Sequence, residues 1–425
     1  MPPDKTPLII RTSLPVPSLE VSPADRQVLR RLAGEVATLA ARPVEAEKRR
    51  LWIDHNALRP TRPVIFCDPE NSWHEIIPAD SLECRGELAR SWEWRLRREI
   101  FWGARMKDDR TIAAWFDIAI PHDEWDWGLH ETYVGNEAGH AHTWKAPIRT
   151  DADLERMHFP VLRIDPKNAS RLVELAAASF GDVLHVRLKT GWWWTLGMTQ
   201  TLAHLRGLEQ LMLDMLDNPA FLHRMMAFFR DGTLAMLAEL EVQGLLCPNR
   251  DSDIGSGGLG WIDELPQTGT SDRVRLRDMW GFCESQETVS VSPRMFAEFV
   301  FPYQVPILEK FGLNCYGCCE PLDRRWQIVK QIPRLRRVSI SPWADREKMA
   351  AELGDRYVFS MKPNPADLAM DTFDEEYIRA GLRKDLKATR NCHMEIVMKD
   401  NHTIRSDPSR VVRWVQVARQ EAENT

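Results

Sequence analysis

Short apolar segments alternate with stretches of helical periodicity from about residue 150 to the end of the chain. Each apolar segment is followed by a stretch in which apolar residues recur every three or four positions, as over 293–311. Such alternation indicates parallel strands joined by crossover helices. Seven strands are predicted in this part, at 182–189, 244–250, 275–282, 313–317, 336–343, 357–365 and 392–399.

The N-terminal part is richer in helical pattern. Amphipathic spacing predicts helices over 25–52 and 82–102, and two apolar runs predict strands at 62–69 and 111–120. Residues 121–146 show no helical period and predict a hairpin or a long loop. This segment is a candidate lid over a binding site.

Seven strands and one of the two earlier strands make eight. We therefore predict an α/β fold, a TIM-like (β/α)8 barrel with an N-terminal helical elaboration and a hairpin lid, and keep an open doubly wound sheet as the alternative. We expect residues 1–110 to form an arm and helices packed on the barrel, and 111–425 to form the barrel itself. The 425 residues, 44% hydrophobic and 28% charged, are typical of a globular protein.

The charge balance of the chain bears on which macromolecules it could bind. Lys and Arg number 56 and Asp and Glu 62, so the net charge is −6 and does not favour nucleic acid or an anionic membrane. Eight cysteines are too few for a disulfide scaffold of this length, and three of them lie within 315–319. Neither a secretory signal nor a membrane span is predicted, so we expect a cytoplasmic protein.

No nucleotide-binding motif is present. The glycine-rich segment 255–260 departs from the G-x-G-x-x-G spacing, and no P-loop, HExxH or GxSxG motif occurs. In both predicted architectures the functional site lies at the carboxyl ends of the strands. The segments that follow the seven strands are rich in Cys, acidic residues, Lys, His and Trp, which makes their convergence the main indication of a site.

The segment CYGCCE at 315–320 is the most specific of these. Thiolate and carboxylate groups bind zinc, and a catalytic zinc keeps one coordination position open. Because strand side chains alternate, Cys318 with Glu320, or Cys315 with Cys318, is favoured over Cys318 with Cys319. The alternative is that these cysteines pack as small apolar residues.

Further candidates follow other strands. His402 is a candidate third zinc ligand or a surface histidine, and Glu395 either faces the interior with a partner or is placed by a wrong register. His140 and His142 form either a second metal pair or part of a structural hairpin. Glu284 is a candidate acid, base or metal ligand, as is the nearby Glu287, unless both lie in a solvated loop.

The remaining candidates are assigned to catalysis or to the substrate. Asp345 and Lys362 are predicted catalytic residues that could pair or hold an anionic group. The chain has 17 Trp against 5 Tyr, which favours either packing or a pocket for a flat ligand. The residues assigned to substrate binding are Trp193, Trp280, Trp343 and His122.

The chain resembles the uroporphyrinogen decarboxylase superfamily over about residues 110–420. The resemblance rests on the cysteine-containing turn near residue 318, on SPRMFAEFVFPYQVPILEKFG at 292–312 before it and on VSISPWADREKMAAELGD at 338–355 after it. The Arg-rich segment of true decarboxylases is missing, since RPVIFCDPENSW stands at 62–73 in its place. The chain is therefore more similar to the corrinoid-dependent methyltransferase branch.

That branch carries His-x-Cys after one strand and a second Cys after the last. Here Tyr316-Gly317-Cys318 stands at the first position and 399–402 at the second, so the resemblance implies zinc held by Cys318, Glu320 and His402. It further implies methyl transfer between a small substrate, such as a methoxylated aromatic, and a corrinoid on a partner protein. The oligomeric state is open, with a homodimer as one option. The alternatives are a metal-free decarboxylase or lyase, and a non-catalytic tetrapyrrole- or corrinoid-binding barrel.

Overall fold

The computed structural model describes residues 19–123, 125–134, 143–266 and 273–424. The chain divides into two compact units, each built from separated segments. The first unit comprises the described parts of Glu124–Leu162 and Trp192–Phe359, and the second those of Lys5–Asp123, Arg163–Gly191 and Ser360–Thr425. Neither unit begins or ends at residue 110, and the expected division into 1–110 and 111–425 stays a prediction.

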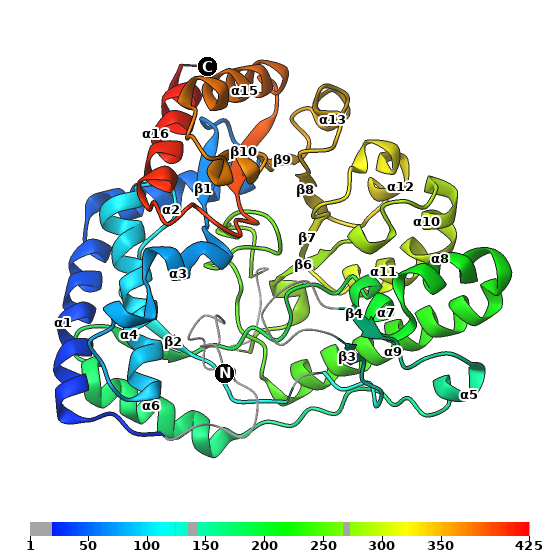
Figure 1. Ribbon diagram of the computed structural model, residues 1–425, viewed down its shortest axis with the longest axis horizontal. Helices are drawn as coiled ribbons and strands as arrows, with labels where there is room; N and C mark the ends of the chain where they lie inside the picture. The colour runs from blue at the N-terminus through cyan, green and yellow to red at the C-terminus, as the bar shows by residue number, and fades with distance from the viewer. Residues whose placement is uncertain (1–18, 124, 135–142, 267–272, 425) are drawn as a thin grey trace. The chain divides into compact units, whose positions relative to one another are not determined.

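The first unit contains three parallel strands that lie side by side in Figure 1, β6, β7 and β8. Its strands are β3 Thr132–Val134, β4 Thr143–Lys145, β6 Trp280–Cys283, β7 Leu313–Tyr316 and β8 Leu335–Ile340. Its helices are α5 Asp151–Leu154, α7 Thr199–Arg206, α8 Leu208–Asp217, α9 Pro219–Gln243, α10 Pro293–Phe299, α11 Phe301–Leu308, α12 Trp326–Val329 and α13 Arg346–Leu353.

The second unit contains two parallel strand pairs, β1 with β10 and β2 with β5. Its strands are β1 Val64–Cys67, β2 Trp115–Ile118, β5 His185–Leu188 and β10 His393–Met398, and β9 Val358–Met361 runs across the boundary between the units. Its helices are α1 Pro23–Ala40, α2 Pro43–Asn56, α3 Trp73–Ile76, α4 Glu87–Phe101, α6 Pro166–Phe180, α14 Ala366–Ala369, α15 Glu375–Ala388 and α16 Ser409–Glu423.

The predicted α/β class is confirmed, but the eight-stranded barrel is not. The described residues form one sheet of six strands in the order β1-β10-β9-β8-β7-β6, and β2 and β5 form a separate sheet. No strand is present at 244–250 among the described residues, although one was predicted there. Pro248 lacks an N–H for a strand ladder, and the side chain of Asn249 instead bonds both the N–H and the C=O of Trp280.

Proline divides two of the predicted helices. The helix expected over 25–52 ends before Pro43, which begins α2, and the one expected over 293–311 is interrupted between α10 and α11. Gly207, at a φ of +90°, separates α7 from α8. The predicted hairpin is present as the antiparallel pair β3–β4, while its tip, including His140 and His142, lies outside the described residues.

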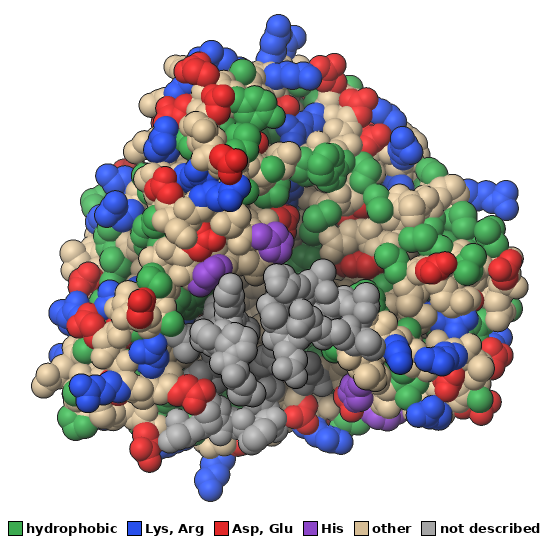
Figure 2. All heavy atoms as spheres, viewed as in Figure 1, with side chains coloured by type: hydrophobic (Ala, Val, Ile, Leu, Met, Phe, Trp, Pro, Cys, Tyr) green, Lys and Arg blue, Asp and Glu red, His purple; other side chains and the backbone are tan. Residues whose placement is uncertain are grey.

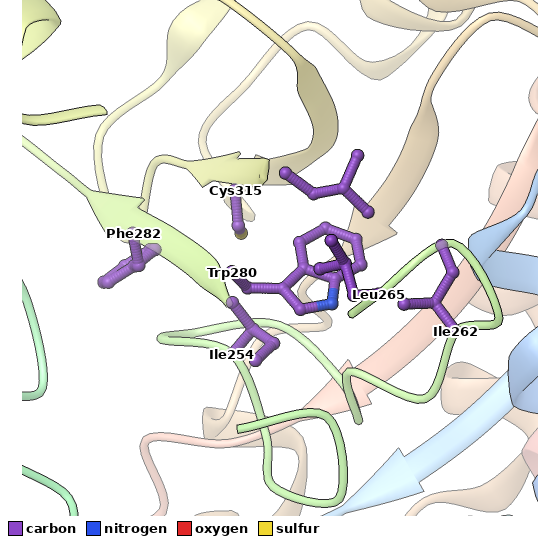
Figure 3. Close-up of a cluster of buried hydrophobic side chains, with 7 residues drawn as sticks. Ile254, Ile262, Leu265, Trp280, Phe282 and Cys315 are labelled. Carbon is purple, nitrogen blue, oxygen red and sulfur yellow. The ribbon is translucent and has the colours of Figure 1, made fainter. Parts of the chain in front are cut away.

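The core of the first unit surrounds Trp280. Figure 3 shows its indole among buried side chains, and its N–H donates to the carbonyl of Gly260 at 2.9 Å. The cluster consists of Ile254, Ile262, Leu265, Trp280, Phe282, Leu313 and Cys315. Trp280 is 1% exposed, so its indole packs in this core. For this residue the structure agrees with packing, which was one of the two interpretations of the tryptophan excess. Cys315 likewise lies in this apolar cluster.

The glycine-rich segment 255–260 packs against this core. Gly255 has a φ of +56°, and a Cβ at this position would lie 2.3 Å from the ring of Phe282. A Cβ at Gly257 would lie 2.6 Å from Cδ of Arg337, whose guanidinium donates to the carbonyl of Gly258. These glycines therefore allow close backbone packing.

On the face shown in Figure 2, basic and acidic side chains of the described residues are interspersed over the surface. This distribution agrees with the small net charge of −6. Within the described part of the chain, no helix has both the length and the hydropathy needed to cross a bilayer.

We predict that Gly255→Ala destabilises the protein by about 2 kcal/mol or more, because it combines a left-handed φ with a clash against Phe282. The control is Gly34→Ala within α1, where nothing lies within 4 Å of the new Cβ. That change should stabilise by about 0.5–1 kcal/mol. Denaturant unfolding of both variants checks this, and equal effects would contradict the packing role of Gly255.

Candidate functional site

The strongest candidate site lies where β6 and β7 end in the first unit. The two strands are parallel, with Cys283 in register with Tyr316, so the residues that follow them meet at one edge of the sheet. Glu284 follows β6 directly, and Cys318 and Glu320 follow β7. The structure therefore places these three predicted site residues at the same edge of the sheet, and their role stays a prediction.

Glu320 joins the two turns. Its carboxylate accepts the backbone N–H of Ser285 at 2.9 Å through Oε1 and that of Cys318 at 2.9 Å through Oε2. The side chain is buried, and burial raises the pKa of Glu320, although backbone N–H groups and Arg325 oppose the rise. One carboxylate therefore fixes the position of both strand ends.

Glu284 is the more perturbed acid. It is 0% exposed, and burial followed by the charges of Glu287 and Glu320 raises its pKa well above the usual value of 4.5. Its Oε2 accepts the N–H of Gln286 at 3.0 Å, and its Oε1 lies 3.2 Å from the hydroxyl of Thr195. Burial and the two neighbouring acids therefore favour the protonated form of Glu284, from which the carboxyl group can donate a proton.

The backbone around Glu284 is held by a buried polar chain. The Tyr316 hydroxyl donates to Oε1 of Gln304 at 2.8 Å, and the amide of Gln304 donates to the carbonyls of Gly197 and Glu284, each at 2.8 Å. Gly197 leaves room for the acid, since a Cβ there would lie 2.8 Å from Oε1 of Glu284. Sequence reasoning missed Gln304, which is a single polar residue in the apolar segment FPYQVPIL.

Arg325 supports the same turns from another direction. Its guanidinium donates to the hydroxyl of Ser285 at 3.0 Å and to the carbonyl of Thr288, and it lies over the ring of Phe296. Burial lowers the pKa of Arg325, while Tyr316 and Glu320 oppose the decrease. The two acids and the thiol are thus set in a rigid, hydrogen-bonded surround.

The predicted zinc ligands are divided between the units. Cys318 is buried, with its Sγ 3.7 Å from Sγ of the exposed Cys319, and it lies beside Glu320. His402 is exposed and belongs to the second unit. The described residues contain no group of three or more His, Cys, Asp or Glu side chains able to hold a metal ion. Cys318 and Glu320 alone supply two donors, so the residues seen together do not make a complete zinc site.

Other predicted site residues have local partners. Asp345 is the N-cap of α13 and accepts the N–H of Lys348 at 3.0 Å. Lys362, in the second unit, is buried and donates to the hydroxyl of Ser360 at 2.8 Å. Glu395 is buried 3.3 Å from His55, so it faces the interior with a partner, one of the two alternatives for this residue.

The residues assigned to the substrate differ in exposure. Trp343 is 72% exposed, while Trp193 is half-buried with its ring 6.0 Å from that of Phe311. His122, in the second unit, is half-buried with Nδ1 2.7 Å from the carbonyl of Asp123. Substrate contact by these side chains stays a prediction.

A second polar cluster lies at the carboxyl ends of β1 and β10. Glu70 accepts the N–H of Asp400 at 2.7 Å. Burial raises the pKa of Glu70 to about 7, the charge of Lys399 opposes the rise, and Asp68 and Asp400 add to it. Sequence reasoning missed Glu70, although the strand-end rule, applied to the predicted strand at 62–69, would have selected it.

Comparison with known proteins adds little. No family model matches the sequence, and no curated protein matches it. Among solved structures, a methyltransferase from Methanosarcina mazei aligns with a TM-score of 0.46 and 9% sequence identity, over 88% of this chain and 97% of that chain. Similarity at this level assigns neither a fold family nor an activity.

The titration of Glu70 predicts a pH-dependent stability. Its folded-state pKa of about 7 lies above the usual 4.5, so the folded state binds the proton more tightly and stability falls as pH rises from about 4.5 to 7. In Glu70→Gln, the decrease in the free energy of unfolding between these pH values should be smaller by up to about 3 kcal/mol. Urea unfolding at pH 5 and 7.5 tests it, and an identical pH dependence in the variant would contradict the shifted pKa.

Proposed function

We propose that the chain is a methyltransferase whose active site is formed by Glu284, Cys318 and Glu320. The observation that carries this proposal is a buried carboxyl group with a raised pKa beside a second carboxylate and a thiol at adjacent strand ends. Methyl transfer from an oxygen or nitrogen needs a proton on the leaving atom. Glu284 is suited to supply it.

The proton can reach a substrate through Thr195. Glu284 is fully buried, but its Oε1 lies 3.2 Å from the hydroxyl of Thr195, which is half-buried. In this proposal the bond from the methyl carbon to its oxygen breaks, the electron pair stays on oxygen, and the oxygen takes a proton from the Thr195 hydroxyl. Glu284 passes its own proton to Thr195 in the same step, so Thr195 stays neutral, Glu284 becomes a carboxylate and the methyl group passes to the acceptor.

The acceptor and the metal are further parts of the proposal. A corrinoid on a partner protein would accept the methyl group, in line with the resemblance to the methyltransferase branch of the uroporphyrinogen decarboxylase superfamily. Zinc would polarise the leaving oxygen as a Lewis acid. Only two donors, Cys318 and Glu320, lie together, which is one fewer than a catalytic zinc takes from the protein. The proton transfer described above therefore includes no step that depends on zinc.

A metal-free decarboxylase or lyase is the second candidate. It is favoured by the same raised pKa of Glu284, because the carbanion left after loss of CO2 must be protonated, and burial shifts Glu284 toward its protonated form. The two candidates share the proton donor and differ in the bond that breaks. Their products distinguish them.

We predict that Glu284→Gln lowers kcat/KM by about 100-fold or more, since the amide cannot donate the proton. The assay follows methylation of cob(I)alamin by a methoxylated aromatic acid and, in parallel, release of CO2 from the same acid. Glu309→Gln, at an exposed position after α11, is the control and should retain full activity. Release of CO2 without methyl transfer would support the lyase, and wild-type rates in Glu284→Gln would exclude both candidates.

Metal analysis tests the zinc proposal separately. On the zinc proposal, protein purified without chelator should contain about one zinc per chain, and Cys318→Ser should lose that zinc. A content well below one zinc, with no recovery of activity on adding metal, would remove zinc from the mechanism. A metal-free lyase should tolerate Cys318→Ser.

A further inference from the structure

The second unit contains a basic cavity, and none of its lining residues belongs to the candidate site. Its volume is ≈ 530 Å³, within the range of small-molecule sites. The wall contains two acidic side chains, Glu47 and Asp109, against five basic ones. The basic residues are Arg42, Lys48, Arg62, Lys107 and Arg419.

Asp109 is shared by two of these guanidinium groups. Arg62 donates to both of its oxygens, at 2.8 and 2.7 Å, and Arg419 donates to Oδ1 at 2.8 Å. The N–H of Ile65 provides a fourth hydrogen bond, at 2.8 Å. Burial raises the pKa of Asp109, but Arg62 and Arg419 outweigh it and the pKa is lowered. The carboxylate is saturated as an acceptor and balances one of its two cations.

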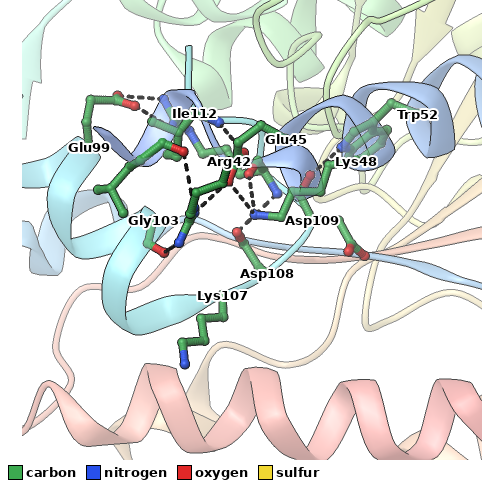
Figure 4. A network of polar contacts seen from close by, with 12 residues as sticks. Arg42, Glu45, Lys48, Trp52, Glu99, Gly103, Lys107, Asp108, Asp109 and Ile112 are labelled. Atoms are coloured by element: carbon green, nitrogen blue, oxygen red, sulfur yellow. Dashed lines mark hydrogen bonds and ion pairs between the residues drawn. The ribbon is translucent and has the colours of Figure 1, made fainter. Parts of the chain in front are cut away.

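Glu45, which does not line the cavity, is shared between two of its basic side chains, Arg42 and Lys48. Arg42 donates to its Oε1 at 2.6 Å, Lys48 lies 3.7 Å from the same oxygen, and the N–H of Ile112 donates to its Oε2 at 2.7 Å. Figure 4 shows this network around Arg42 and Lys48. Lys48 also interacts electrostatically with the buried Asp108, so its charge is shared between two acids.

Two basic groups keep unused donors. Lys107 has no hydrogen-bond or ion-pair partner for its ammonium among the described residues, and in Figure 4 its side chain points away from the network. Arg419 uses Nη2 for Asp109 and for the carbonyl of Lys107, at 3.2 Å. Its Nε and Nη1 have no partner in the described part of the chain.

We propose that this cavity binds the phosphate group of a small phosphorylated molecule. Arg42, Lys48 and Arg62 also donate to backbone carbonyls, so the donors left for a ligand are the ammonium of Lys107 and Nε and Nη1 of Arg419. A phosphate dianion supplies several acceptor oxygens in the geometry that guanidinium groups match. The volume exceeds that of one phosphate, and Val44 and Leu51 add apolar surface for an organic body. Neither Glu284 nor Glu320 takes part, so the proposal is independent of the proposed function.

Isothermal titration of the full chain at constant ionic strength tests the proposal with inorganic phosphate, AMP and succinate. AMP and phosphate should bind at one site per chain, with AMP tighter because its body contacts the apolar wall, and succinate should bind about 10-fold more weakly than AMP. If phosphate binds more tightly than AMP, the cavity is a site for the free anion, and the proposal of a phosphorylated organic ligand is wrong.

Two variants locate the binding. Lys107→Gln and Arg419→Gln should each weaken AMP binding by about 5- to 20-fold, since each removes a charge-assisted hydrogen bond. Lys107 has no partner to lose, so its variant should fold normally. Lys310→Gln, at an exposed position in the first unit, is the matched control and should bind like the unchanged protein.

Three results would overturn the proposal. They are the absence of saturable binding up to about 10 mM of either phosphate probe, equal affinity for succinate and AMP, and unchanged AMP affinity in both cavity variants. Because binding is measured without turnover, none of them bears on the catalytic role of Glu284.

Discussion

A buried carboxylate that accepts backbone N–H groups from two strand ends is the constraint on which the candidate site depends. Glu320 ties the N–H of Ser285 to that of Cys318, so the turn after β6 and the turn after β7 share one acceptor. An isolated buried charge costs several kcal/mol, and these hydrogen bonds are what make its burial tolerable. Loss of either N–H partner would leave one carboxylate oxygen without its backbone donor. The turns, the thiol and Glu284 therefore keep their positions together.

The second unit uses acidic side chains in a related way. Asp109 and Asp108 accept the N–H groups of Ile65 and Cys67, two alternate residues of β1. β1 stands at one end of the strand order, and strand edges need their N–H groups covered. Burial raises the pKa of Asp108 to about 6, whereas Arg62 and Arg419 keep Asp109 ionised. Covering this edge brings the guanidinium groups together, and the basic cavity is a consequence.

Much of the element pattern could be predicted from the sequence, because strands such as β7 and β10 are short apolar runs followed by clear helices. The strand-end rule selected Glu284, Cys318 and Glu320, which follow the adjacent parallel strands β6 and β7. Among the described residues, the strand predicted at 244–250 is absent because an apolar run is equally compatible with an extended segment that joins no sheet. Here the side chain of Asn249, rather than its backbone, forms the hydrogen bonds to Trp280. The register of pairing and the closure of a barrel depend on such tertiary hydrogen bonds, which periodicity does not encode.

The tryptophans show the same limit at the level of single residues. Trp280 and Trp343 both lie near strand ends in the sequence, yet one is 1% and the other 72% exposed. Trp280 is surrounded by buried apolar side chains, and its indole N–H has an acceptor in the carbonyl of Gly260. Composition thus reports how many flat side chains a chain contains. Which of them remain available to a ligand depends on tertiary packing and on hydrogen-bond acceptors such as Gly260, which lies 20 residues from Trp280 in the sequence and which periodicity does not reveal.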